Sequence, residues 1–91
     1  MIGTTMEEIK DKVFTGHEVE FTYNDCDYTI ELSEDKGVRL AEMWKMEEVP
    51  IRVAKCVVKT IDDLDLLFGE KCFEGKAFFD IEQSVIVTIM Y

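Results

Sequence analysis

Alternating apolar and polar residues at positions 19–32 constrain the fold more than any other feature of this chain. The apolar positions of the pattern are Val19, Phe21, Tyr23, Tyr28, Ile30 and Leu32. Side chains two residues apart lie on the same face of a strand, so the pattern predicts a β-hairpin that buries one face. The connecting residues 24–27 contain no Asn-Gly pair, which leaves the turn type open.

A segment with helical spacing precedes this hairpin. Thr5 and Glu8 fit the S/T-x-x-E capping box, and apolar residues then recur three and four positions apart as far as Phe14. Gly16 is a C-terminal signal, so we predict a helix over residues 6–15. A helix this short is marginal on its own and needs a surface to pack against.

The second half of the chain contains both kinds of pattern. Residues 51–58 are rich in β-branched side chains, which favours a strand. Thr60 is followed by acidic residues and then by apolar residues at helical spacing, which predicts a helix over residues 60–68 that ends at Gly69. One or two helical turns are expected at residues 76–81.

Two further segments are predicted to be strands. Residues 38–46 alternate with period two, although four of their apolar residues would also line one side of a helix. Residues 84–91 are apolar on both sides of the pattern. We therefore expect this last strand to be central in the sheet or covered on both faces.

Together these elements predict a single α+β domain over residues 1–91. It should have two layers, an antiparallel or mixed sheet of four to five strands with two to three short helices on one face. Residues 1–5 are expected to be disordered or to derive from cloning. The predicted core consists of Ile9, Val13, Val19, Phe21, Tyr23, Ile30, Leu64, Leu67, Val85, Val87 and Ile89.

The charge of the chain bears on the kind of partner it can bind. It has 20 acidic and 10 basic residues and a net charge of −10. Residues 1–49 account for −8 of this charge and residues 50–91 for −2. A surface of this sign repels nucleic-acid phosphate and anionic lipid. We therefore expect a protein partner with a basic surface, and no direct binding to nucleic acid or to membranes.

The cysteines and the chain start indicate the compartment. Cys26, Cys56 and Cys72 are odd in number and widely spaced, without a CxxC pair, as is typical of reduced thiols. Residues 1–12 lack the basic and apolar regions of a secretory signal. No apolar run approaches the roughly 20 residues of a membrane helix. We expect a cytoplasmic protein, and the sequence leaves its oligomeric state open.

Catalytic motifs are not recognisable in the sequence. It has no Gly-rich phosphate loop, no Ser-His-Asp set and no H-E-x-x-H motif, so we expect neither an enzyme nor a cofactor. The alternative is a small ligand-binding or thiol-dependent enzyme domain in which one of the three cysteines pairs with His17, the single histidine.

Three aspartates, Asp62, Asp63 and Asp65, raise the question of a metal site. Hard divalent cations prefer several carboxylate oxygens, but a calcium loop spreads its acidic residues and carries a glycine and a distal glutamate. Here the aspartates lie in the first turns of a predicted helix, where the helix dipole favours anions. A solvated helix face is the favoured interpretation, and no metal is expected.

Acidic residues also gather on the predicted hairpin. Glu18, Glu20 and Glu31 are expected to share its exposed face, with Asp25 and Asp27 at its tip. One interpretation is that like charges protect a sheet edge and keep the protein soluble. The other is an acidic docking surface for a basic partner, or a mimic of nucleic-acid phosphate. Charge alone does not decide between them.

Trp44 is the remaining candidate for partner binding. Tryptophan is enriched at interface hot spots, and Met43 and Met46 beside it would adapt to an irregular surface. Large aromatic side chains are nevertheless mostly buried. A core position is therefore favoured over an interface position for this residue.

The order of elements resembles a group of small acidic proteins encoded by phages and mobile elements. The segments that carry the resemblance are the hairpin Glu18-Val-Glu-Phe-Thr-Tyr-Asn with Tyr28-Thr-Ile, then Thr60-Ile-Asp-Asp-Leu, and Gly75-Lys-Ala-Phe-Phe-Asp-Ile. Some members of this group, anti-CRISPR proteins among them, inhibit nucleic-acid enzymes by occupying basic clefts. The resemblance therefore implies a non-enzymatic protein-binding module, with inhibition of such a partner as one role.

Overall fold

The sheet has five antiparallel strands. The structure, a computed structural model, describes residue 1 and residues 3–90, apart from the side chain of Ile89. The strands are β1 (Val19–Tyr23), β2 (Cys26–Asp35), β3 (Val38–Met46), β4 (Ile51–Val57) and β5 (Ile86–Met90). Their order across the sheet is β4-β3-β2-β1-β5. The prediction of an α+β fold is confirmed, and residues 38–46 are a strand.

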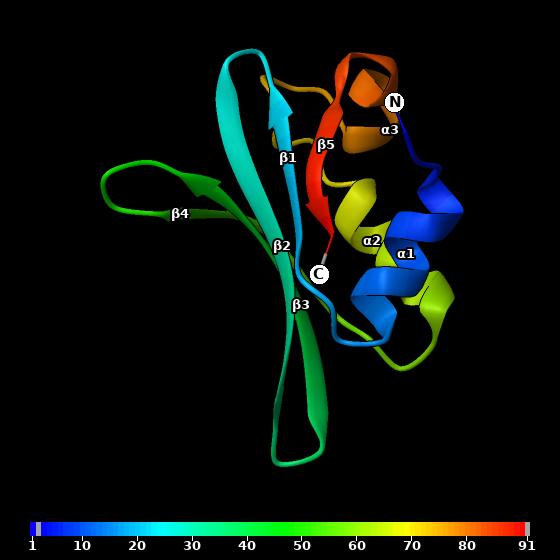
Figure 1. Cartoon of the computed structure of the whole chain (residues 1–91). Coiled ribbons are helices and arrows are strands. Elements are labelled where there is room, and N and C mark those ends of the chain that lie inside the picture. The colour runs from blue at the N-terminus through cyan, green and yellow to red at the C-terminus, as the bar shows by residue number, and fades with distance from the viewer. Residues whose placement is uncertain (2, 91) are drawn as a thin grey trace.

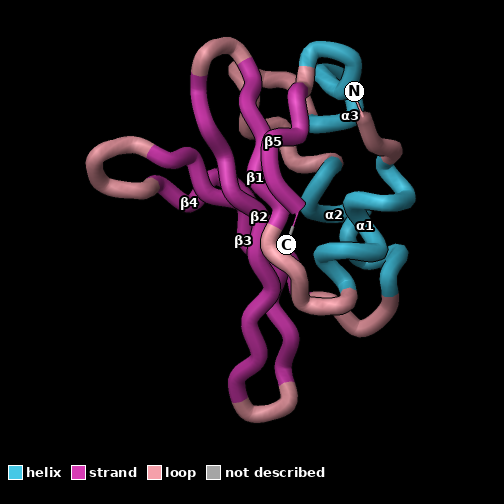
Figure 2. The backbone as a smooth tube through the Cα atoms, in the orientation of Figure 1, coloured by secondary structure: helices cyan, strands magenta, loops and turns pink. Residues whose placement is uncertain are grey.

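All the helices lie on one face of this sheet (Figures 1 and 2). They are α1 (Met6–Phe14), α2 (Leu64–Phe68) and α3 (Phe78–Ile81), with 3₁₀ turns at Ile61–Asp63 and Glu82–Ser84. The opposite face carries no helix among the described residues. The turn between β3 and β4 curls away from the helices, toward that uncovered side (Figure 1).

Two tight turns set the register of the three central strands. Asn24 and Asp25 both have positive φ, as do Lys36 and Gly37. Positive φ at both central residues defines a type I′ turn, whose twist matches that of the flanking strands. Asparagine and aspartate adopt this conformation more readily than most residues. The first turn fixes the pairing of Phe21 with Tyr28.

The core between sheet and helices is built on a cluster of aromatic rings. The Phe21 ring stacks on the Tyr28 ring with centroids 5.0 Å apart, and it also contacts the Phe78 ring edge-on at 5.2 Å. Phe73 packs against Tyr28 at 5.1 Å, and Phe68 against Phe78 at 5.0 Å. Both geometries are favourable for aromatic pairs. One contiguous cluster therefore joins β1, β2, α2 and α3.

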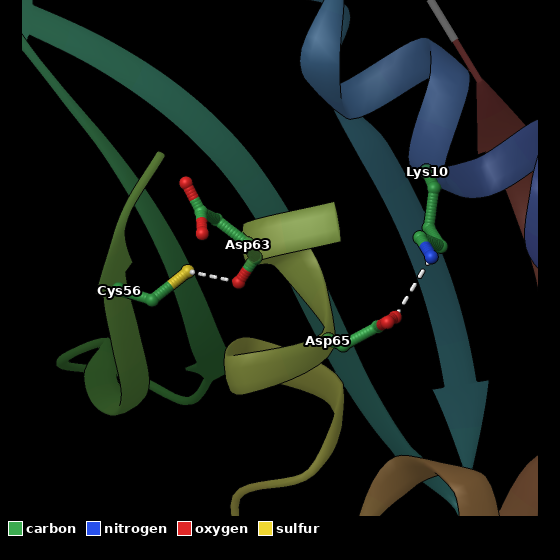
Figure 3. A network of polar contacts seen from close by, with 4 residues as sticks. All are labelled: Lys10, Cys56, Asp63 and Asp65. Carbon is green, nitrogen blue, oxygen red and sulfur yellow. Dashed lines mark hydrogen bonds and ion pairs between the residues drawn. The ribbon is translucent and has the colours of Figure 1, made fainter. Parts of the chain in front are cut away.

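Polar contacts attach α2 to its neighbours on two sides (Figure 3). The Lys10 ammonium of α1 lies 2.7 Å from the Asp65 carboxylate. On the other side, the Cys56 thiol of β4 donates to the backbone carbonyl of Asp63. The Asp63 carboxylate accepts hydrogen bonds from the backbone N–H groups of Thr60 and Lys59, which lowers its pKa. Asp63 and Asp65 are thus engaged with separate partners and point in different directions.

Arg39 ties the far end of the long β2–β3 hairpin to the first helix. Its guanidinium lies 4.6 Å from the centroid of the Phe14 ring and donates a hydrogen bond to the Phe14 carbonyl. The last carbonyls of a helix lack intrahelical partners, and a cation there is favourable. Arg39 therefore closes the C-terminal end of α1 against the sheet.

The prediction for the last strand is wrong in its position. β5 is an edge strand that pairs only with β1 among the described strands, and Ile86 is 49% exposed. Val85 and Val87 face the helices, whereas Ile86 pairs with Thr22 on the other face. The apolar pattern of a segment predicts which of its side chains are buried. It does not predict how many neighbouring strands the segment pairs with.

The predicted core is confirmed in most of its members. Ile9, Val13, Val19, Phe21, Ile30, Leu64, Leu67 and Val85 are buried. Tyr23 and Val87 are only partly buried against the core, and the side chain of Ile89 lies outside the described residues. The sequence reasoning did not place Phe73 or Phe78 in the core, because they follow glycine-containing turns without a regular period.

Residues that precede α1 make ordered contacts. The Thr5 hydroxyl accepts from the Glu8 backbone N–H, so the predicted capping residue is the N-cap. Met1 packs against the edge of the core, and the Thr4 hydroxyl donates to the Glu8 carboxylate. Residue 2, within the segment expected to be disordered, lies outside the described residues.

None of the described helices has the length and apolar character needed to cross a membrane.

Phe21→Ala tests the aromatic cluster. Phe21 is 1% exposed, and its truncation should lower the free energy of unfolding by about 2–5 kcal/mol, through lost burial and the cavity left behind. Phe79→Ala is the matched control because this ring is 44% exposed, and it should cost at most about 1 kcal/mol. Urea unfolding measures both. A Phe21 variant as stable as the control would contradict the packing described here.

Asp63→Asn tests the backbone cap before α2. Because its two N–H partners lower the pKa of Asp63 in the folded state, ionised Asp63 stabilises the fold above the ordinary aspartate pKa, and this contribution disappears as pH falls through the lowered value. The melting temperature should therefore fall in the variant at pH 7, and the difference should shrink as pH falls below about 4 and vanish once pH is below the lowered pKa of Asp63. Asp62→Asn, an exposed neighbour, is the control. A constant difference from pH 7 to pH 2 would contradict the assignment.

Candidate functional site

Strand register determines which side chains occupy the uncovered face. Thr29 of β2 pairs with Glu20 of β1 and with Trp44 of β3, so all three share that face. Continuation of the Val19–Ile30 pairing places Glu18 opposite Glu31. The acidic residues of the hairpin and the only tryptophan of the chain therefore project from the same side of the sheet, away from the helices.

A cavity of about 300 Å³ lies on this face. Its lining residues are Glu18, Thr29, Glu31, Trp44, Met46 and Pro50. Glu18 immediately precedes β1, Thr29 and Glu31 lie on β2, and Trp44 lies on β3. Met46 is the last residue of β3, and Pro50 belongs to the turn that follows. This turn curls toward the uncovered face (Figure 2), and its residue Pro50 lines the cavity together with Trp44. The cavity thus combines apolar walls with two carboxylates.

Trp44 does not occupy the core position that the sequence favoured. Its neighbour Met43 is buried under the helices, and a strand alternates faces, so Trp44 projects to the other side. The ring is partly exposed, and its Nε1 atom is buried without a hydrogen-bond acceptor among the described residues. A buried donor left unpaired costs about 1–3 kcal/mol. No hydrogen bond therefore fixes the indole orientation.

The carboxylates around the cavity lack cationic partners within the described part of the chain. The ion pairs found there join Lys10 to Asp65, Lys45 to Glu47 and Arg52 to Glu42. Glu42 lies on the uncovered face too, with its side chain 12% exposed, and Arg52 of β4 compensates it at 3.0 Å. Glu18, Glu20 and Glu31 are in none of these pairs. Their negative charge is therefore uncompensated on the β1–β2 side of the face.

The structure divides the six predicted partner-binding residues into two groups. Glu18, Glu31 and Trp44 line the cavity, and Glu20 lies beside it on the same face. Asp25 is exposed in the turn, and Asp27 accepts a hydrogen bond from the Thr22 hydroxyl at 2.8 Å. These two aspartates lie at the hairpin tip, as expected, outside the cavity. Met46, which the sequence placed beside Trp44 as an adaptable neighbour, lines the cavity, whereas sequence reasoning missed Pro50, because the turn after β3 brings it there.

His17 and the cysteines, the alternative site, lie apart. His17 precedes β1 and Cys26 follows it, so the strand separates them by roughly 20 Å. Cys56 is on β4, three strand spacings or about 14 Å from β1. Cys72 lies with Cys26 around a second cavity of about 210 Å³, at the opposite end of β1 from His17. Burial raises the pKa of both Cys56 and Cys72, which disfavours the nucleophilic thiolate.

No protein-family model, curated protein or solved structure matches this chain. The resemblance to small acidic phage-encoded proteins therefore stays a prediction from the sequence.

Thiol reactivity tests the cysteine environments. In the variant Cys26→Ser/Cys72→Ser, the remaining Cys56 should react with a disulfide reagent more slowly than a free thiol at pH 7, because burial raises its pKa. Its rate should rise as pH passes above the usual thiol range. The variant Cys26→Ser/Cys56→Ser reports on Cys72 in the same way. A thiol that reacts at full rate near pH 6 would instead support the thiol-dependent alternative.

Proposed function

We propose that this chain is a non-enzymatic protein-binding module that docks the uncovered sheet face onto a basic surface of another protein. The observation that carries the proposal is the uncompensated charge of Glu18, Glu20 and Glu31 around Trp44, on a face that no described helix covers. Solubility alone requires dispersed charge and gives no reason for a partly exposed tryptophan among the carboxylates.

The arrangement of this face matches the usual division of roles in an interface. Uncompensated charges at its margin steer a partner of opposite sign and raise the association rate. A central aromatic residue with adaptable neighbours then supplies affinity after contact. Trp44 and Met46 fill the second role, and the glutamates fill the first. Because Arg52 and Lys55 lie on β4, the basic partner would approach from the β1–β2 side.

The kind of partner follows from the sign and spread of the charge. A net charge of −10 on 91 residues resembles the charge that a nucleic acid presents to its binding proteins. A basic cleft that normally holds phosphate would therefore accept this acidic face. The role proposed for the chain is that of an inhibitor which occupies such a cleft and competes with nucleic acid.

Charge reversal tests the docking. Glu18→Lys/Glu20→Lys/Glu31→Lys should lower the association rate with a protein captured by the wild type by about tenfold or more, because steering is lost. The wild-type rate should also fall as salt rises from about 0.1 to 1 M, where the Debye length shrinks from about 10 to about 3 Å. Surface plasmon resonance measures both rates. Thermal unfolding should change little, since Glu31 is exposed, Glu18 and Glu20 are partly exposed, and charges at the surface contribute little to stability.

A matched variant separates this surface from net charge. Glu34→Lys/Glu70→Lys/Glu74→Lys makes the same change in charge at exposed positions outside the cavity lining. Its association rate should stay within about threefold of the wild type, since only general attraction is reduced. Equal losses in the two triple variants, or no loss in either, would contradict docking through the uncovered face.

A further inference from the structure

The cavity beside Trp44 combines two surfaces that suit different parts of one ligand. Trp44, Met46 and Pro50 present apolar walls, whereas Glu18 and Glu31 present carboxylates. A purely apolar ligand would leave those charges unsatisfied, and a small hydrated cation would leave the apolar walls in contact with water. A side chain with an apolar stem and a cationic head satisfies both surfaces.

The two glutamates are placed to share one cation. Glu18 immediately precedes β1, and continuation of the Val19–Ile30 pairing places it opposite Glu31 of β2; neither is in an ion pair among the described residues. Like charges directly opposite each other destabilise a sheet. A cation between them would turn this repulsion into two attractions. The free protein therefore retains an electrostatic strain that a bound cation relieves.

The indole of Trp44 favours a planar cation. A guanidinium stacks on tryptophan and accepts a planar, two-pronged arrangement of carboxylate oxygens, whereas the compact ammonium of lysine is more strongly hydrated. A turn of the indole toward such a group would break no hydrogen bond, since its Nε1 has no acceptor among the described residues.

We infer that this cavity receives a single arginine side chain from the basic partner, with the guanidinium stacked on Trp44 between the carboxylates of Glu18 and Glu31. The arginine stem lies along Met46 and Pro50. This inference rests on the proposed function and deepens it, because it names the group through which the partner is held.

Trp44 is the only tryptophan, so its fluorescence reports directly on the cavity. The probes are three acetylated, amidated tripeptides, Gly-X-Gly, in which X is arginine, lysine or citrulline. Citrulline has the shape of arginine without its charge. The arginine peptide should give a saturable fluorescence change, the lysine peptide should bind at least threefold more weakly, and the citrulline peptide at least tenfold more weakly. Equal binding of arginine and citrulline would overturn the inference.

A pair of neutral substitutions locates the binding. Glu18→Gln/Glu31→Gln should lower the affinity for the arginine peptide at least tenfold. The control Glu34→Gln/Glu70→Gln, which loses the same charge elsewhere, should change this affinity less than threefold. The first variant should also melt at the same or a higher temperature than the wild type, because the repulsion between the two glutamates is removed. Equal weakening in both variants, or a lower melting temperature in the first, would overturn the assignment.

The outcomes also separate this inference from the proposed function. If Glu18→Lys/Glu20→Lys/Glu31→Lys loses a protein partner but the arginine peptide leaves Trp44 fluorescence unchanged, docking stands and the arginine cavity is wrong. If these substitutions change neither the binding of the protein partner nor the binding of the arginine peptide, both proposals fail.

Discussion

The stacked pair of Phe21 and Tyr28 is the interaction on which the rest of the structure depends. The two rings lie on paired positions of β1 and β2, and the type I′ turn at residues 24–25 brings them together. The rings of Phe73 and Phe78 then pack onto this pair from the segment that follows α2. The pairing is local in sequence, whereas the helices that cover it come from distant segments. The pair therefore defines which face of the sheet becomes the core.

This choice of face determines where function can reside. A sheet five strands wide has more surface than three short helices cover, and the helices all lie on one face (Figure 1). This is the face on which Phe21 contacts Phe78 of α3. The side chains at the alternate positions, Trp44 and the glutamates included, therefore project to a face that no described helix covers. Arg52 pairs with Glu42 and Lys10 with Asp65. Glu18, Glu20 and Glu31, on the β1–β2 side of the uncovered face, are in none of the ion pairs of the described residues.

The sequence predicted what depends on local periodicity. The hairpin, the Thr5 cap and the burial of residues such as Val19 and Leu64 follow from spacing alone, and the structure confirms them. It could not predict the edge position of β5, because strand order depends on which strands meet in space. The face of Trp44 was derivable in principle: the strand interpretation of residues 38–46 puts Trp44 opposite Met43. The cavity was not, since the turn that supplies Pro50 has no periodic signal.

The central claim is that the uncovered face around Trp44 recognises cationic groups. A titration followed by ¹H–¹⁵N NMR tests it most directly, because each backbone amide and the single indole N–H report their own environment. With the arginine peptide as probe, the largest chemical-shift changes should fall on Glu18, Thr29, Glu31 and the Trp44 indole, and should diminish with added salt. Changes that instead centre on the helices, or on the second cavity around Cys26 and Cys72, would contradict the account.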